Sequence, residues 1–214
     1  MARFDLVIFD CDGVVVDSER IVHGVFGAFI RSLGVRLNES ELHERFLGLR
    51  LEECMRIVED LRGEPVPAGA LDRYVEERDR VLRAQVQPVE GIRAVIEALA
   101  VPYCIASSGG YDKMRITLGA TGLMPFFAGR LFSAVDVPRG KPAPDVFLFA
   151  AERMGAAPSR TVVIEDSVNG VLAGCAAGMT VFGFAGLTPA ERLGAAGAVL
   201  TFREMRALPA LLDD

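Results

Sequence analysis

The chain has 214 residues, 51% of them hydrophobic, so it is long enough to bury one sizeable core and a smaller second lobe. A net charge of −6 excludes long-range attraction to nucleic acids or anionic membranes, so an anionic substrate needs positive charge supplied locally. The four cysteines are scattered, without the paired spacing of a zinc site, and no basic leader or long apolar run appears. We therefore expect a cytoplasmic protein that binds neither membrane nor nucleic acid.

The first predicted strand, LVIF at residues 6–9, runs directly into a cluster of acids. Asp10, Asp12 and Asp17 follow it. Because alternate residues of a strand point to the same side, Asp10 and Asp12 should converge, and Gly13 permits the turn that follows. Like charges this close cost free energy unless a cation neutralises them. We therefore expect a positive partner beyond the end of this strand.

Residues 18–83 show only helical patterns. One apolar face of the first helix is formed by Ile21, Val25 and Phe29. Asn38, three residues before Glu41, fits a helix N-terminal capping box. We predict a helical insertion over 18–83, with residues 1–17 and 84–214 forming the core.

Short apolar runs rich in β-branched residues alternate with helical segments in the rest of the chain. The predicted strands are 103–107, 130–134, 161–165, 180–184 and 198–200. This alternation is typical of a parallel sheet covered by helices. The sequence therefore predicts an α/β fold in which the helical insertion follows the first strand.

Polar residues that suit a phosphate follow two of these strands. Ser107 and Ser108 precede two glycines, a layout whose hydroxyl and backbone N–H groups can hold a phosphate. Lys141 lies just before Pro142, which stiffens the loop that carries the lysine. Both segments should lie at the carboxyl end of the sheet, where open α/β folds bind their ligands.

Four carboxylates are expected to meet at the same edge. Glu165 and Asp166 end a later strand just as Asp10 and Asp12 follow the first. Oxygen ligands without Cys or His favour Mg²⁺, and the metal together with Lys141 would allow a dianionic phosphoryl group to bind. One carboxylate can then attack phosphorus to give an aspartyl-phosphate. Asp12, if protonated, can donate to the leaving oxygen and afterwards activate water.

Four motifs in chain order carry a resemblance to a known family. DCDGVVVDSE, IASSG, GKPAPDVF and IEDSVNG resemble the motifs of the haloacid-dehalogenase superfamily. The helical insertion resembles the α-helical cap of its β-phosphoglucomutase-like branch, and the resemblance covers essentially the whole chain. It implies a Rossmann-like core with a mobile cap that closes over the site.

The resemblance also assigns roles to individual residues. It makes Asp10 the nucleophile and Asp12 the general acid/base. The implied metal ligands are Asp10, Asp12 through its backbone carbonyl, Asp166 and, directly or through water, Glu165. The expected substrate-binding residues are Ser107, Ser108, Lys141 and Arg50. For Arg50 a solvated cation at a helix start is the alternative, and we expect His23 and His43 to be ordinary packed or surface residues.

These roles predict a monomeric, Mg²⁺-dependent phosphatase that hydrolyses a small phosphorylated metabolite: a sugar, sugar-acid or polyol phosphate. The alternative is a phosphosugar mutase of the β-phosphoglucomutase type. In those mutases a Lys and an Asn follow the serines of the second motif, and a His follows the first motif. Here Gly110, Tyr111 and Val22 occupy those places, although Lys113 lies near enough to keep the mutase open.

Three other functions are less consistent with the motifs. A haloacid dehalogenase needs neither Asp12 nor Asp166. A phospho-receiver signalling domain also gathers acids around Mg²⁺, but it has no use for a cap. A catalytically inactive interaction protein would not retain every expected catalytic residue.

Overall fold

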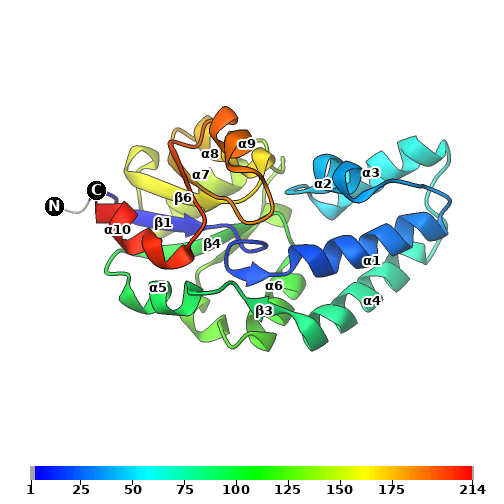
Figure 1. Ribbon diagram of the computed structural model, residues 1–214, viewed down its shortest axis with the longest axis horizontal. Helices are drawn as coiled ribbons and strands as arrows, with labels where there is room; N and C mark the ends of the chain where they lie inside the picture. The colour runs from blue at the N-terminus through cyan, green and yellow to red at the C-terminus, as the bar shows by residue number, and fades with distance from the viewer. Residues whose placement is uncertain (1–2, 214) are drawn as a thin grey trace.

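A computed structural model describes residues 3–213, in which a sheet covered by helices lies beside a group of helices (Figure 1). The strands of the sheet are β1 (Leu6–Phe9), β4 (Tyr103–Ser107), β5 (Leu131–Ser133), β6 (Thr161–Glu165), β7 (Thr180–Phe184) and β8 (Leu200–Phe202). All pair in parallel, in the order β5-β4-β1-β6-β7-β8. This confirms the predicted parallel α/β fold.

The central strand β1 is buried on both faces, which explains its unbroken apolar run. Val7 and Phe9 belong to the apolar core on one face, whereas Leu6 and Ile8 belong to the core on the other. The helices around the sheet are α5 (Ile92–Ala98), α6 (Tyr111–Ala120), α7 (Asp145–Met154), α8 (Val168–Ala176), α9 (Ala190–Ala195) and α10 (Leu208–Asp213). Residues of α5, α6 and α10 pack on the first face and residues of α7, α8 and α9 on the second. Short 3-10 turns lie at Met124–Phe127, Ala134–Asp136, Pro158–Arg160 and Met205–Ala207.

The remaining helices follow one another between β2 (Val16–Asp17) and β3 (Gln87–Pro88), which pair as a short antiparallel ladder. They are α1 (Glu19–Ser32), α2 (Glu39–Phe46), α3 (Leu51–Arg62) and α4 (Ala70–Gln85). The predicted capping box is present, because Asn38 and Glu41 exchange side-chain to backbone hydrogen bonds. No helix within residues 3–213 is both long and apolar enough to cross a membrane.

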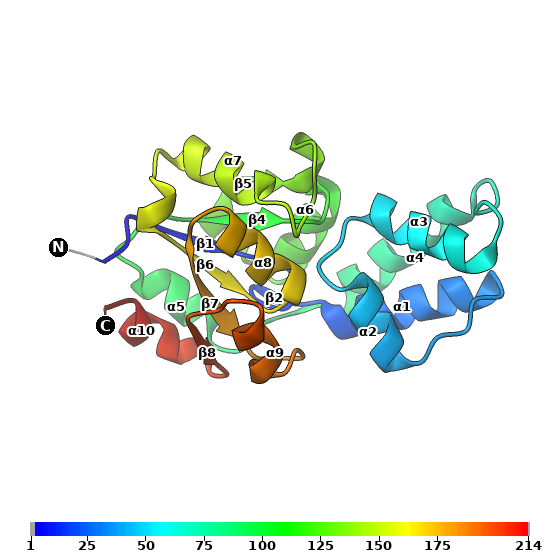
Figure 2. The same cartoon turned by 90° about the horizontal axis from the view of Figure 1, so that it is seen from above.

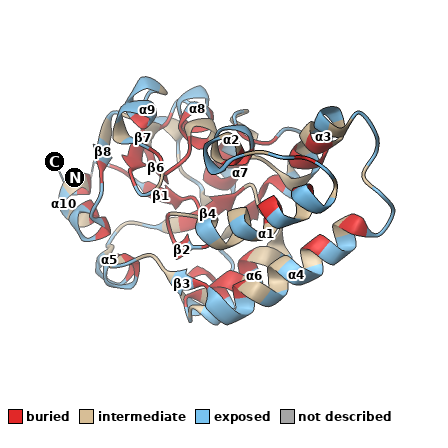
Figure 3. Ribbon diagram, turned by 45° about the vertical axis from the view of Figure 1, so that its right-hand side comes forward, coloured by how far each residue is buried: buried red, intermediate tan, exposed pale blue. Residues whose placement is uncertain are grey.

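These helices enclose an apolar cluster of their own, centred on Phe26, Phe46, Val58 and Tyr74. On α1 the buried side chains include Phe26 and Ile30, one turn apart, and both α1 and α4 also carry exposed residues (Figure 3). The group therefore packs on its own core beside the sheet. In Figures 1 and 2 it lies at the carboxyl ends of β1, β4 and β6.

Candidate active site

Lys141 provides the positive partner that the acids after β1 require. Its side chain is 1% exposed, and Nζ lies 2.6 Å from Asp10 Oδ1 and 2.6 Å from Glu165 Oε1. Nζ also donates to the carbonyl oxygen of Ala106 at 3.3 Å. Burial by itself would lower the pKa of Lys141, but Asp10 and Glu165 raise it overall, so the side chain stays charged. Burial raises the pKa of Asp10 to about 7 in spite of Lys141.

The two acids that end β6 have different surroundings. Glu165 is fully buried, and its second carboxylate oxygen accepts hydrogen bonds from the backbone N–H and the hydroxyl of Ser167, both at 2.9 Å. Asp166 is 2% exposed and packs against Gly13, whose φ is +79° and where a Cβ would overlap the Asp166 carboxylate. Glycine at position 13 therefore permits both the positive φ of the turn and the close approach of the Asp166 carboxylate to the backbone.

Three of these carboxylates suit a bound cation. Asp10, Glu165 and Asp166 each offer an oxygen, and these oxygens lie within 4.8 Å of one another. Burial, together with the negative charges of Glu19, Glu165 and Asp10, raises the pKa of Asp166 well above its ordinary value. Within residues 3–213, the Asp166 carboxylate makes no hydrogen bond or ion pair. Lys141 supplies one positive charge for both Asp10 and Glu165, so the three acids together still carry excess negative charge, and hard oxygen donors of this kind fit Mg²⁺.

Asp12 is held by a second cation and a hydroxyl. Lys113 Nζ lies 2.8 Å from Asp12 Oδ1, and the Ser18 hydroxyl donates to the same oxygen. Burial alone would raise the pKa of Asp12, but Lys113 and Ser18 lower it overall. Lys113 comes from the first turn of α6, so the core itself orients this carboxylate.

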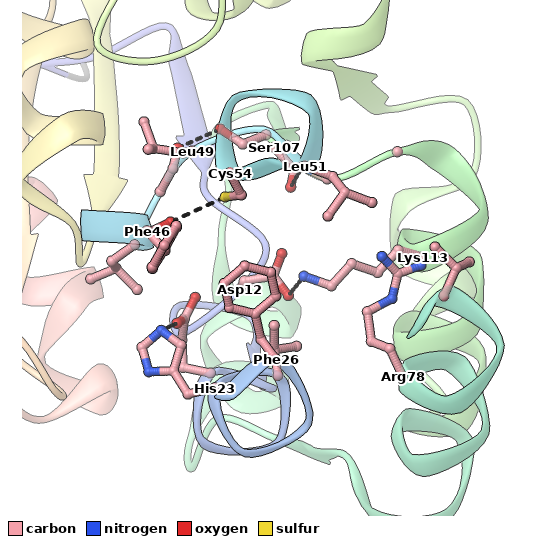
Figure 4. Close-up of a pocket in the computed structure, with 18 of the residues that line it drawn as sticks. Asp12, His23, Phe26, Phe46, Leu49, Leu51, Cys54, Arg78, Ser107 and Lys113 are labelled. Carbon is pink, nitrogen blue, oxygen red and sulfur yellow. Dashed lines mark hydrogen bonds and ion pairs between the residues drawn. The ribbon is translucent and has the colours of Figure 1, made fainter. Parts of the chain in front are cut away.

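A cavity of about 640 Å³ lies between these residues and helices α1–α4. On the core side it is lined by Asp10, Asp12, Ser107, Ser108, Lys113 and Asp166. On the helical side its lining includes Glu19, His23, Phe26, Phe46, Leu49, Tyr74 and Arg78. Figure 4 shows Asp12 facing this space, with Lys113 and Arg78 approaching from one side and His23 from the other. The cavity thus joins the carboxylate cluster to a mixed polar and aromatic wall.

The family model for haloacid dehalogenase-like hydrolases matches residues 4–178. The chain belongs to the haloacid dehalogenase-like hydrolases. The 6-phosphogluconate phosphatase of Escherichia coli (strain K12) is 32% identical over 212 residues, which are 99% of this chain and 96% of that protein. A conserved haloacid dehalogenase-like protein of unknown function from Agrobacterium tumefaciens str. C58 has a crystal structure with a TM-score of 0.83 and 38% identity, covering 98% of this chain and 97% of that one. A HAD family hydrolase from Deinococcus radiodurans R1, solved with bound phosphate and sodium, has a TM-score of 0.77 and 32% identity, covering 99% of this chain and 96% of that one.

Ser107, the last residue of β4, and Ser108, which follows it, point to different places in this hydrolase. Ser107 is 1% exposed, lines the cavity and accepts a hydrogen bond from the Gly109 N–H at 2.9 Å. Ser108 also borders the cavity, but its hydroxyl donates to the carbonyl oxygen of Gly48, between α2 and α3, at 2.8 Å. Ser107 therefore lies with the carboxylates, whereas Ser108 ties the core to the helical group.

Arg50, which we expect to contact substrate, points elsewhere. Its guanidinium donates to the backbone carbonyls of Ala134 at 3.1 Å and Val137 at 3.3 Å, both in the core. The side chain packs so closely on Gly140 that a Cβ there would overlap it. Arg50 is not among the described residues that line the cavity, so its position fits a contact between the helical group and the core.

Four residues at the cavity were not predicted to take part in the site. His23 lines the cavity, 3.4 Å from Glu19, and burial lowers its pKa to about 4, so it is neutral at pH 7. Glu19 is the last residue of the first motif, DCDGVVVDSE, and this is a signal that can be read from the sequence. Lys113 was considered only for the mutase, and Arg78 lies on a helix rich in charges where no local signal separates it from its neighbours.

Proposed function

We propose that this haloacid dehalogenase-like hydrolase is a Mg²⁺-dependent phosphatase of a small phosphorylated sugar, sugar acid or polyol. One observation carries the proposal: Asp10 lines the cavity, pairs with Lys141 and lies beside Asp166, and Asp12 lines the same cavity. A relative similar over nearly the full length is a 6-phosphogluconate phosphatase, and a similar crystal structure holds phosphate. Both comparisons support a phosphoryl substrate.

The proposed reaction has two steps. In the first, a carboxylate oxygen of Asp10 attacks phosphorus and the bond from phosphorus to the leaving alcohol oxygen breaks. Asp12, whose pKa Lys113 and Ser18 lower, must first take up a proton from solvent, which it then gives to the leaving oxygen. In the second, Asp12 takes a proton from water, the water oxygen attacks phosphorus, and Asp10 is released with inorganic phosphate. Ser107 and Lys141 hold the phosphoryl oxygens.

Asp10, Asp166 and the Asp12 backbone carbonyl would hold the metal. Both oxygens of Glu165 already accept from protein donors, which favours contact with the metal through water. Bound Mg²⁺ supplies positive charge to the crowded carboxylates and the incoming phosphoryl group.

We also propose that residues 18–83 act as the cap that selects the leaving group, over a core of 1–17 and 84–214. The supporting observations are the separate apolar cluster of α1–α4 and the cavity between these helices and the core. The hydrogen bonds of Arg50 and Ser108 across this boundary suit a closed arrangement. A cap closed in this way keeps bulk water from the phosphoryl group.

A phosphosugar mutase is the second candidate, because Lys113 lines the cavity and could face a distal phosphate. The Lys113 ammonium already pairs with Asp12, and the Tyr111 hydroxyl donates to Asp136. A dianionic second phosphate would have to compete with the Asp12 carboxylate for Lys113, which favours hydrolysis.

The test is release of inorganic phosphate from a panel of phosphorylated sugars, sugar acids and polyols in the presence of Mg²⁺. Asp10→Asn should keep the shape of the site but lower release by several orders of magnitude, because the nucleophile is lost. Turnover near that of the wild type in this variant would reject Asp10 as the nucleophile. Isomerisation of a sugar phosphate that far exceeds phosphate release would favour the mutase.

A further inference from the structure

Two cationic side chains occupy the cavity beyond the residues that handle the phosphoryl group. Lys113 comes from α6 and Arg78 from α4, two helices that pack against each other. Figure 4 shows them converging on the same part of the cavity. Arg78 interacts electrostatically with both Lys113 and Asp12. Each cation has a carboxylate partner, but the two still repel one another, and an anion placed between them would relieve that repulsion.

The guanidinium of Arg78 is held in place by neighbouring side chains of α4. Asp79 accepts from Nε at 2.8 Å and lies 2.6 Å from Nη2, and the side chain is 11% exposed. The guanidinium also lies over the ring of Tyr74, 5.8 Å from its centroid. A guanidinium held in this way can receive a carboxylate with little further loss of side-chain entropy.

The charges around this pair suit a monoanion better than a dianion. Lys113 is paired with Asp12, and Arg78 with Asp79, so each cation already has one negative neighbour. A second phosphate would add two negative charges to a nearly neutral group, whereas a carboxylate adds one. Glu19 and His23, 3.4 Å apart in the same cavity, offer hydrogen-bonding groups for hydroxyls between the two ends of a ligand.

We propose that Arg78 is a specificity-determining residue that binds the carboxylate of a phosphorylated sugar acid. This inference rests on the proposed phosphatase function and narrows its substrate class from sugar derivatives in general to acids. The phosphoryl end of such a substrate meets Asp10 and Lys141, while the acid end meets Arg78 on the helical side of the cavity. The name of the Escherichia coli relative is consistent with this class.

The experiment compares two substrates that differ at one carbon. Gluconate 6-phosphate carries a carboxylate at C1, and glucitol 6-phosphate carries a neutral CH₂OH there. Arg78→Gln should lower kcat/KM for the acid by about 10- to 100-fold, since a hydrogen bond to a charged group is lost, and change kcat/KM for the alcohol by less than about threefold. Arg78→Lys should recover part of the loss. Arg80→Gln, on an exposed part of the same helix, is the matched control and should change neither value.

Several outcomes would overturn the assignment. An equal loss for both substrates would make Arg78 a structural residue, and a wild-type enzyme that does not prefer the acid would remove the reason for a carboxylate site. A larger effect of Arg78→Gln on a sugar bisphosphate than on the acid would assign the site to a second phosphate.

Binding measurements separate this inference from the phosphatase proposal. Calorimetric titration of Asp10→Asn with the two monophosphates, with Mg²⁺ present, does not require turnover. In one outcome Asp10→Asn binds the acid more tightly than the alcohol, and the double variant with Asp10→Asn and Arg78→Gln binds both equally. That outcome supports the carboxylate site even if the wild type releases no phosphate. Equal binding of acid and alcohol by Asp10→Asn rejects the site even if the wild type is an active phosphatase.

Discussion

Replacing Lys141 with methionine should destabilise the metal-free protein severely. The substitution keeps most of the side-chain volume but removes the charge that lies 2.6 Å from both Asp10 and Glu165. Removing one partner of a buried ion pair costs about 3–5 kcal/mol, which for a chain of this size lowers the unfolding midpoint by about 6–20 °C. The same variant should lose phosphate release, because a phosphoryl ligand is lost with the charge.

The measurement is thermal and urea unfolding of metal-free Lys141→Met, followed by circular dichroism. Arg139→Met is the matched control: it removes a cation two residues away, whose side chain is 70% exposed and whose ion pair with Asp145 is therefore screened by solvent, so it should leave the midpoint unchanged. A loss below about 1 kcal/mol in Lys141→Met, as for an exposed pair, would refute the reasoning. It would mean that Asp10 and Glu165 reach water or take up protons without cost.

Three further predictions follow from the same geometry. Excess EDTA should abolish phosphate release and Mg²⁺ should restore it, and Mg²⁺ should raise the unfolding midpoint more at pH 8 than at pH 5.5. The reason is that burial raises the pKa of Asp10 to about 7, so the metal must displace protons at the lower pH; an equal shift at both pH values would contradict this. Gly170→Ala should lower the free energy of unfolding by about 1–3 kcal/mol, because the added Cβ would overlap the Glu165 carboxylate. Gly119→Ala, in open space on α6, should raise the free energy of unfolding by about 0.5–1 kcal/mol, and urea unfolding of both variants tests the contrast. Arg50→Ala should lower kcat/KM by roughly tenfold for every substrate alike, since Arg50 contacts the core backbone and not the cavity; a loss confined to one substrate in steady-state assays would restore it as a substrate ligand.

The sequence by itself determined the parallel fold and the gathering of the charged motifs. A strand that is buried on both faces has an unbroken run of apolar residues in its sequence. Parallel strands place their carboxyl ends at the same edge of the sheet. The sequence therefore predicted that Asp10, Asp12, Glu165 and Asp166 meet. The structure brings oxygens of Asp10, Glu165 and Asp166 within 4.8 Å of one another, whereas the Asp12 carboxylate pairs with Lys113. The same reasoning required a cation, and Lys141 lies between two of these acids. These inferences depend on local patterns and on a property common to all parallel sheets.

Only the tertiary structure decided which side chains of the helical group reach the cavity. Arg78 and Arg80 lie on the same charged helix, yet one side chain lines the cavity and the other is 69% exposed. Arg50 turns to carbonyls of the core, and Lys113 pairs with Asp12. Each outcome depends on how α1–α4 pack against the sheet and α6. The side chains of a helix point to all sides, and the elements packed around the helix decide which of those side chains face the ligand.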